Sequence, residues 1–123
     1  MKSICLGLDF GTESVRALLV DQNNGNEMAC AEVKYPLGVI SERLPGSPDL
    51  LPANFALQSA TGYLDSMYSA VREVLTNTKP EEIAGIGVAF TSCTVLPVRK
   101  DGTPLHVLDE YKRNPHAWVK LWK

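Results

Sequence analysis

The sequence predicts an α/β fold in which a mixed sheet starts as an antiparallel three-strand meander and gains a further strand through a helical crossover. Two strand-like apolar segments flank a short polar break at residues 11–14, and a third follows a polar turn at 21–26. A segment with apolar residues at helical spacing, 59–77, then separates these three from another apolar run at 83–90. Period-two and 3.6-residue patterns distinguish strands from amphipathic helices.

The first three strands are predicted from their alternation and from the turns between them. Apolar side chains alternate with small or polar ones over 4–10, and 15–20 is dense in aliphatic residues, so the polar break between them is expected to be a hairpin turn. Residues 21–26 are rich in Asp, Asn and Gly, which tolerate positive φ, so the chain is expected to turn again into a strand over 27–35.

A long loop and then a helix follow the meander. Four prolines and two glycines between residues 36 and 54 exclude regular structure over much of that stretch. The helix is expected over 59–77 with Ser59 as its N-cap. Because a crossover of this length usually returns the chain in the same direction, the strand over 83–90 is expected to lie parallel in the same sheet. The predicted buried face of the helix consists of Leu64, Met67, Val71, Val74 and Leu75.

The last third of the chain predicts short strands at 95–99 and 104–108 around an Asp101-Gly102 hairpin signal. Residues 117–123 alternate apolar and basic side chains, which predicts another strand with Trp118 and Trp122 on one face. Two tryptophans on one face need protein to pack against. We therefore expect this sequence to be part of a longer protein.

Composition bounds the class of protein. With 123 residues, 45% hydrophobic and 21% charged, the chain matches one globular domain and not a disordered or collagen-like one. Its formal net charge of -2 is spread along the sequence, so no nucleic-acid or membrane partner is expected. Cys5, Cys30 and Cys93 lack metal-ligand spacing and are expected to be buried, reduced thiols. Asp9 interrupts the first apolar run too early for a signal peptide, so a cytoplasmic protein is expected.

The segment with the clearest chemistry is 9–16, where an acidic residue ends one strand and a polar turn begins the next. Turn amides and hydroxyls can point into one concavity and donate to phosphate oxygens, while Gly11 leaves room for the backbone to approach. The carboxylate of Asp9 suits a Mg²⁺ ion held through water, and Arg16 adds a fixed positive charge. The predicted phosphate-binding residues are Asp9, Gly11, Thr12, Glu13, Ser14 and Arg16.

An ordinary hairpin, in which Asp9 and Thr12 only satisfy turn amides, explains the same spacing about as well. The sequence contains neither a Walker A nor a Rossmann glycine pattern. Gly85 and Gly87 resemble half of the latter, but they lie inside a predicted strand and indicate close packing against the helix. Spacing alone leaves both a phosphate loop and a plain turn open.

The predicted order of elements is the layout of the ribonuclease-H-like core that actin-like ATPases share. Within it, residues 7–17 (GLDFGTESVRA) are similar to the phosphate-one motif that opens the FGGY carbohydrate kinases. Residues 85–94 (GIGVAFTSCT) resemble that family's next core strand and the sugar-facing turn after it. With two motifs at this separation, the sequence is identified as a member of the FGGY family.

Residues 54–58, 114–117 and 121–123 resemble the bacterial ribulokinase branch of that family. The helix start departs from the branch, since SATGY at 59–63 replaces its usual His-Pro-x-Asp-Tyr, which predicts weaker capping. Relatives often carry a hydroxyl residue at the position of Glu13, so its backbone amide is the expected contact. The resemblance implies that residues 1–123 are the leading part of the kinase's amino-terminal domain, without the rest of that domain or the carboxy-terminal domain.

The resemblance also implies ATP-dependent phosphorylation of a ketopentose such as ribulose at its terminal hydroxyl, with Mg²⁺ as cofactor. It assigns no catalytic residue to this chain, because the general-base aspartate of such kinases is expected beyond Lys123, so the chain alone is expected to be inactive. The expected partners are the sugar, ATP and the carboxy-terminal domain, and a homo-oligomer is left open. The sugar-binding residues that it implies, at a strand end, are Thr91, Ser92, Cys93 and Thr94.

Other functions remain compatible with the sequence. These are an FGGY kinase of the xylulose or glycerol type and a non-enzymatic, actin-like nucleotide-binding domain, since fold alone does not separate them. An isolated protein-interaction domain would need a self-contained chain end, against which the apolar run at 118–123 argues. His106 and His116 each stand alone in a predicted strand or loop, and we expect no catalytic role for either.

Overall fold

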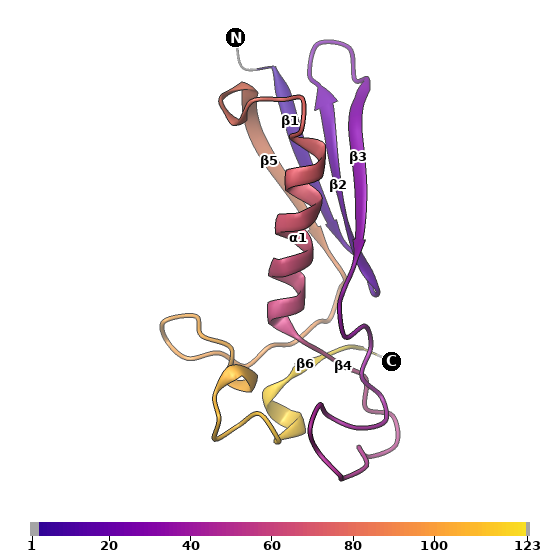
Figure 1. The fold of residues 1–123 in the computed structure, drawn as a ribbon, viewed down its shortest axis with the longest axis vertical. Coiled ribbons are helices and arrows are strands. Elements are labelled where there is room, and N and C mark those ends of the chain that lie inside the picture. Colours follow the sequence, from indigo (N-terminus) through magenta and orange to yellow (C-terminus); the bar gives the residue numbers. More distant parts are fainter. Residues whose placement is uncertain (1–2, 123) are drawn as a thin grey trace. The chain divides into compact units, whose positions relative to one another are not determined.

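A computed structural model describes residues 3–122 of the chain (Figure 1). The chain divides into two compact units. The first unit contains the residues up to Pro36 together with Tyr63–Thr91, and the second contains Leu37–Gly62 together with the residues from Ser92 onward. Helix α1, Ala60–Val74, begins in the second unit and continues through the first.

The first unit is built on a four-stranded mixed sheet. Its strands are β1 (Ile4–Phe10), β2 (Ser14–Asp21), β3 (Glu27–Lys34) and β5 (Ile83–Phe90), in the order β3-β2-β1-β5. β1, β2 and β3 pair antiparallel, whereas β5, which follows a short 3-10 helix at Pro80–Glu82, pairs parallel with β1. The predicted α/β fold, with its meander and its helical crossover to a parallel strand, is therefore confirmed.

Alternation along the strands gives the sheet one apolar face. α1 covers this face (Figure 1), and the ring of Tyr63 contacts that of Phe10 edge-on, with 6.3 Å between centroids. Burial of such side chains stabilises the fold by about 1.5–3 kcal/mol each. Asp9 and Arg16 have the opposite parity and therefore point to the other face. The buried residues of β1 and β2 are Ile4, Leu6, Leu8, Phe10, Val15, Ala17 and Leu19.

The buried face of α1 differs from the predicted one. Leu64 is 51% exposed, so its predicted place in the core is wrong. The prediction failed because it omitted Tyr63, which packs among aromatic rings, and Ser66, whose hydroxyl donates to the carbonyl of Lys34 at 3.0 Å. The helix also ends before 75–77, which form turns. The side chains of α1 that are buried lie at three- and four-residue steps: Ala60, Tyr63, Ser66, Ala70 and Val74.

β5 lies at one edge of the described sheet and is largely exposed. Ile86 and Val88 are 64% and 65% exposed. A Cβ atom added to Gly85 or Gly87 would meet nothing within 4 Å, so the predicted close packing of these glycines against the helix is wrong. Gly87 pairs with Gly7 of β1, on the face of the sheet that α1 does not cover.

The second unit has little regular structure and a small core. Strands β4 (Leu57–Gln58) and β6 (Val119–Lys120) pair antiparallel, and 3-10 helices cover Leu105–Val107 and Pro115–Ala117. The proline-rich stretch before β4 contains turns and an isolated bridge at Ile40, in agreement with the prediction. The core of this unit consists of Ile40, Leu44, Leu57, Ala117 and Trp118.

The predicted hairpin in this unit forms only as a turn. The Arg99 amide donates to the Thr103 carbonyl at 2.9 Å, and Gly102 takes a φ of 86°, as the Asp-Gly signal predicts. Its flanks are joined by one isolated bridge, between Val98 and Pro104, and Val95 forms another with Lys120. Residues 105–107 form a 3-10 helix instead of a strand. The two predicted strands are therefore wrong.

The strand predicted over 117–123 is shorter than expected. Only β6 forms within it, and the residues before β6 belong to the 3-10 helix at Pro115–Ala117. Trp118 is buried whereas Trp122 is 79% exposed, so the predicted common face of the two tryptophans is also wrong. Lys123, the last residue of the predicted strand, lies outside the described residues.

The predicted burial of the thiols is corrected as well. Cys30 and Cys93 are exposed and Cys5 is half-buried, although all three are free thiols as predicted. Between residues 3 and 122, no helix has both the length and the apolar character that a membrane crossing requires.

Candidate functional site

The turn between β1 and β2 is a tight hairpin closed by its own backbone. The Gly11 amide donates to the Ser14 carbonyl at 2.9 Å. A Cβ atom added to Gly11 would lie 3.3 Å from that carbonyl oxygen, closer than side chains normally approach. A side chain at this position would therefore press against the carbonyl that closes the turn, and the Gly11 amide is occupied within the turn itself.

A pocket of about 300 Å³ opens at this turn. That volume lies at the lower end of the range for small-molecule sites. Every residue that the sequence predicted for phosphate binding lines it, and one further residue, Glu32 of β3, joins them. The lining residues are Asp9, Gly11, Thr12, Glu13, Ser14, Arg16 and Glu32. The structure therefore gathers the six predicted residues in one place, while their role in binding stays a prediction.

Charged side chains form a row across the sheet at this pocket. Asp9 of β1 pairs in register with Arg16 of β2, and Arg16 pairs with Glu32 of β3. All three are exposed. With Glu13, the pocket lining carries three carboxylates and one guanidinium. A larger, mainly apolar pocket of about 530 Å³ on the same sheet shares Asp9 and Arg16 with it.

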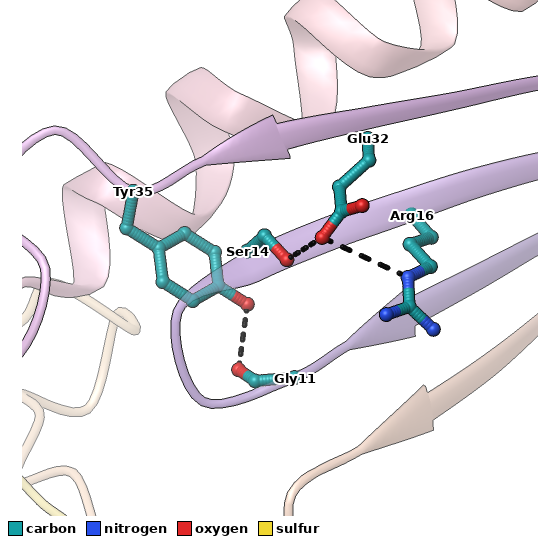
Figure 2. A network of polar contacts seen from close by, with 5 residues as sticks. All are labelled: Gly11, Ser14, Arg16, Glu32 and Tyr35. Carbon is teal, nitrogen blue, oxygen red and sulfur yellow. Dashed lines mark hydrogen bonds and ion pairs between the residues drawn. The ribbon is translucent and has the colours of Figure 1, made fainter.

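Glu32 contacts two of the predicted residues (Figure 2). The Ser14 hydroxyl donates to Glu32 Oε1 at 2.6 Å, and Arg16 Nε lies 3.8 Å from the same oxygen. Sequence reasoning missed Glu32 because it lies 16 residues beyond Arg16 in an otherwise ordinary strand. The sequence signal that comes nearest to identifying Glu32 is the strand register, which is obtained by counting residue pairs outward from the turn at 21–26.

Tyr35 supports the turn from the end of β3. Its hydroxyl donates to the Gly11 carbonyl at 3.0 Å (Figure 2). Its amide donates to the Glu13 carbonyl at 2.9 Å. Burial, and then the carboxylate of Asp9, raise the pKa of Tyr35 to about 12, so the hydroxyl keeps its proton and remains a donor. The ring packs edge-on against Tyr63 with 4.9 Å between centroids. One buried residue thus holds both sides of the turn.

The predicted sugar-binding residues fall into both units. Thr91 directly follows β5, and both its amide and its hydroxyl donate to the carbonyl of Phe10, at 3.0 and 2.9 Å. It therefore joins the ends of β5 and β1. Ser92, Cys93 and Thr94 belong to the second unit, where Cys93 adopts a left-handed φ of 58° and is exposed.

The two histidines have structural partners. Nε2 of His106 accepts a hydrogen bond from the Ala60 amide, at the start of α1, at 3.0 Å. The His106 ring stacks on Trp118 with 4.5 Å between centroids, and burial lowers its pKa below its usual value of 6.5, which keeps the ring neutral and able to accept. Nδ1 of His116 lies 2.7 Å from Lys120 Nζ. Sequence reasoning identified neither contact.

The pocket chemistry fits a metal-bound phosphate better than a bare one. A phosphate anion beside three carboxylates and one guanidinium is repelled unless a cation accompanies it. Asp9 is exposed and its carboxylate is accessible to such a cation. Residues 3–122 contain no cluster of three His, Cys, Asp or Glu side chains suited to hold a metal alone. Magnesium needs only one or two carboxylates besides water and phosphate.

Comparison with known proteins shows similarity to ribulokinases. The chain is 46% identical over 121 residues to the ribulokinase of Mycolicibacterium smegmatis, a match that covers 96% of this chain. It is 46% identical over 124 residues to that of Geobacillus thermodenitrificans (99% of this chain), and 44% identical over 120 residues to that of Halalkalibacterium halodurans (96% of this chain). The resemblance that the motifs predicted is therefore confirmed.

These matches cover only part of the relatives. The chain spans 22%, 22% and 21% of the lengths of these three ribulokinases. No family model matches the chain. The expected general-base aspartate beyond Lys123 stays a prediction, because the sequence comprises residues 1–123.

Proposed function

We propose that this chain, which is ribulokinase-like along nearly its whole length, is the amino-terminal part of an ATP-dependent carbohydrate kinase acting in carbohydrate catabolism. The reaction transfers the γ-phosphoryl group of ATP to the terminal hydroxyl of a ketopentose, ribulose being the first candidate. The first and second units belong to a ribonuclease-H-like domain of the actin-like type, which continues beyond Lys123 and precedes a carboxy-terminal domain. A cytoplasmic location, where ATP is abundant, fits this activity.

The observation that supports the proposal best is the gathering of six motif residues around one polar pocket. In this role Arg16 contacts the phosphates, together with turn amides and the hydroxyl of Thr12, while the Ser14 oxygen lines the same site. Asp9 holds Mg²⁺ through water, and the ion, when bound, neutralises charge on the phosphates. Phosphoryl transfer needs mainly positioning and electrostatic stabilisation, which a rigid turn on two strands supplies.

In the complete protein, the turn after β5 is proposed to bind the sugar. Thr91, Ser92, Cys93 and Thr94 offer hydroxyl and thiol groups where a strand ends, the usual place for ligands in open α/β sheets. The left-handed backbone at Cys93 supports a functional role, because such conformations are costly for residues other than glycine. The general base and the adenine-binding residues lie outside this chain.

The test is sugar-dependent ADP release by the complete protein. ATP and Mg²⁺ are supplied with ribulose, xylulose or glycerol, each at several concentrations, and kcat/KM is compared. We expect ribulose to be the best of the three. A clear preference for xylulose or glycerol would instead indicate another sugar kinase, and ATP binding with no sugar-dependent turnover would indicate a non-enzymatic nucleotide-binding domain.

The same assay applied to residues 1–123 alone tests whether later segments of the protein are needed for catalysis. We expect no detectable phosphorylation, because in-line transfer requires the sugar hydroxyl, its base and the γ-phosphate to be held together. Turnover within about tenfold of the complete protein, a barrier difference of about 1.4 kcal/mol, would contradict the proposal that later segments supply the base.

A further inference from the structure

Glu32 is the one lining residue of the β1–β2 pocket that the phosphate-loop motif does not contain. Its carboxylate is directed at that motif, with a single oxygen, Oε1, 2.6 Å from Ser14 Oγ and 3.8 Å from Arg16 Nε. The side chains of Arg16 and Glu32 are 61% and 51% exposed. Exposed ion pairs contribute little to folding stability, so holding the fold together is a poor explanation for this arrangement.

The backbone register sets the position of Glu32. Arg16 lies opposite Glu32 in the β2–β3 pairing, and Leu19 lies opposite Ala29, but Val20 pairs with Glu27. Met28 is therefore an extra residue, and the strand is irregular at this point. Without that irregularity Arg16 would lie opposite Ala31. The extra residue thus moves a carboxylate to the face that carries Asp9 and Arg16.

The contact with Ser14 fixes what its hydroxyl can do. A serine hydroxyl has one proton and two lone pairs. Because the proton of Ser14 is donated to Glu32, its oxygen presents lone pairs to a ligand and accepts hydrogen bonds instead of donating them. Such an oxygen suits water bound to a cation, whereas a phosphate oxygen needs a donor.

The contact with Arg16 fixes the direction of its guanidinium. Nε faces Glu32, and Figure 2 shows the two terminal nitrogens pointing away from that carboxylate. Terminal nitrogens presented side by side match a phosphate group in two-point contact. Glu32 thus engages one edge of the guanidinium and leaves the other for a ligand.

We propose that Glu32 is a positioning residue of this pocket, which holds Arg16 for phosphate and sets Ser14 as an acceptor for the cation's water. This inference rests on the proposed function, because it presupposes that Mg²⁺ and ATP bind here. It also separates the six motif residues by task, with Arg16 on the phosphate side and Ser14 on the cation side.

The sign of one measurement separates this role from a simple charge effect. The complete protein is titrated calorimetrically with the magnesium complex of the β,γ-imido analogue of ATP, without sugar. We expect Glu32→Ala to weaken binding about fivefold to tenfold, as for a lost charged hydrogen bond. If Glu32 were only a negative charge near an anion, its removal would tighten binding. Tightened or unchanged binding overturns the proposal.

Two further variants sharpen the result. Glu32→Gln keeps an oxygen that can accept from Ser14 but loses the charge that faces Arg16, so we expect an intermediate dissociation constant. Glu73→Gln, at an exposed carboxylate of α1 that lines neither pocket of the sheet, is the matched control and should bind the analogue as the wild type does. An equal loss in the control would overturn the assignment to Glu32.

A mutant cycle tests whether Glu32 acts through its two partners. In a Ser14→Ala/Arg16→Ala background, Glu32→Ala should change the dissociation constant by less than about twofold, since coupled residues are non-additive. Full additivity overturns the positioning role. A wild-type protein that binds the analogue and phosphorylates a sugar, with Glu32→Ala indistinguishable from it, overturns this inference alone. A wild-type protein that does neither overturns the proposed function as well.

Discussion

The two units of the chain are stabilised in different ways. The first has three strands of eight residues and one of seven, with buried side chains spread along β1, β2 and α1. The second has two strands of two residues each and a small core around Trp118. Because burial in the first unit is spread over many side chains, that unit can accommodate a pocket of net negative charge at the β1–β2 turn. The stability of the second unit depends on the few side chains of its small core.

The largest effect that this difference predicts is on stability in the second unit. Trp118→Ala should lower the free energy of unfolding by about 3–5 kcal/mol, the usual cost of removing a large buried aromatic side chain. Trp118 also donates from Nε1 to the Lys112 carbonyl at 3.0 Å, and that acceptor would lose its partner. Urea unfolding measures the change. Trp122→Ala, at an exposed position, is the control and should stay within about 0.5 kcal/mol.

The next effect concerns catalysis in the first unit. In the complete protein, Asp9→Asn should lower kcat about 100-fold, or about 2.7 kcal/mol, while leaving the sugar dissociation constant within about twofold. The physical reason is that the carboxylate acts on the metal and phosphates and not on the sugar. Steady-state kinetics and sugar titration provide both numbers, with Asp65→Asn on the exposed side of α1 as control. Weaker sugar binding at unchanged kcat would contradict this role.

A smaller effect should separate the sugar side from the phosphate side. Ser92→Leu should raise the KM for the ketose about tenfold, because a bulky apolar side chain replaces a small polar one at the proposed sugar wall, whereas Ser92→Ala should raise it less. The KM for ATP should not change. An unchanged KM for the ketose together with a raised KM for ATP would contradict the assignment of Ser92 to sugar binding.

Acidification should weaken the second unit selectively. The pKa of His106 is lowered in the folded chain, so the unfolded chain binds more protons once the pH falls below about 6.5. Its contribution to stability is therefore present above that pH and is lost as the pH falls toward the folded pKa. Unfolding of wild type and His106→Gln is compared between pH 7.5 and 5.5. We expect the wild type to lose more stability than the variant over this range, and equal losses would contradict the role of His106 at the start of α1.

The smallest effect should come from the support behind the turn. Tyr35→Phe removes the hydrogen bond to the Gly11 carbonyl and should cost about 1 kcal/mol of stability. Tyr68→Phe removes a hydroxyl from an exposed tyrosine of α1 and is the matched control. Equal unfolding midpoints for the two variants would show that the contact adds nothing to the turn.

Sequence patterns located the first unit well because its signals are local. Alternation, two turns and a helical segment specify β1, β2, β3, α1 and β5, and the phosphate-loop residues follow from one turn. Glu32 could not be found in the same way. An even count from the turn at 21–26 pairs Arg16 with Ala31, and only the extra residue at Met28 corrects the register.

The second unit was harder to predict because tertiary contacts decide it. The 95–108 segment has β-branched residues and an Asp-Gly turn, yet Leu105–Val107 form a 3-10 helix instead of a strand. In this helix His106 accepts a hydrogen bond from the Ala60 amide at the start of α1. The spacing of apolar and polar residues along the sequence indicates neither the His106–Ala60 hydrogen bond nor the stacking of His106 on Trp118. Contacts between residues 46 positions apart can be read only from the folded chain.

The irregularity in β3 also determines which length changes the hairpin can accept. Deleting Met28 would remove the unpaired residue and leave Arg16 opposite Glu32, because the pairs between Leu19 and the β1–β2 turn keep their partners. Deleting any other single residue from Ala29 to Ala31 would give the same Arg16–Glu32 pairing, with Met28 then opposite Leu19, whereas deleting two residues there would turn Glu32 to the covered face of the sheet. Among natural variants of this hairpin, single-residue deletions from Met28 to Ala31 should therefore be tolerated, and two-residue deletions there should be absent.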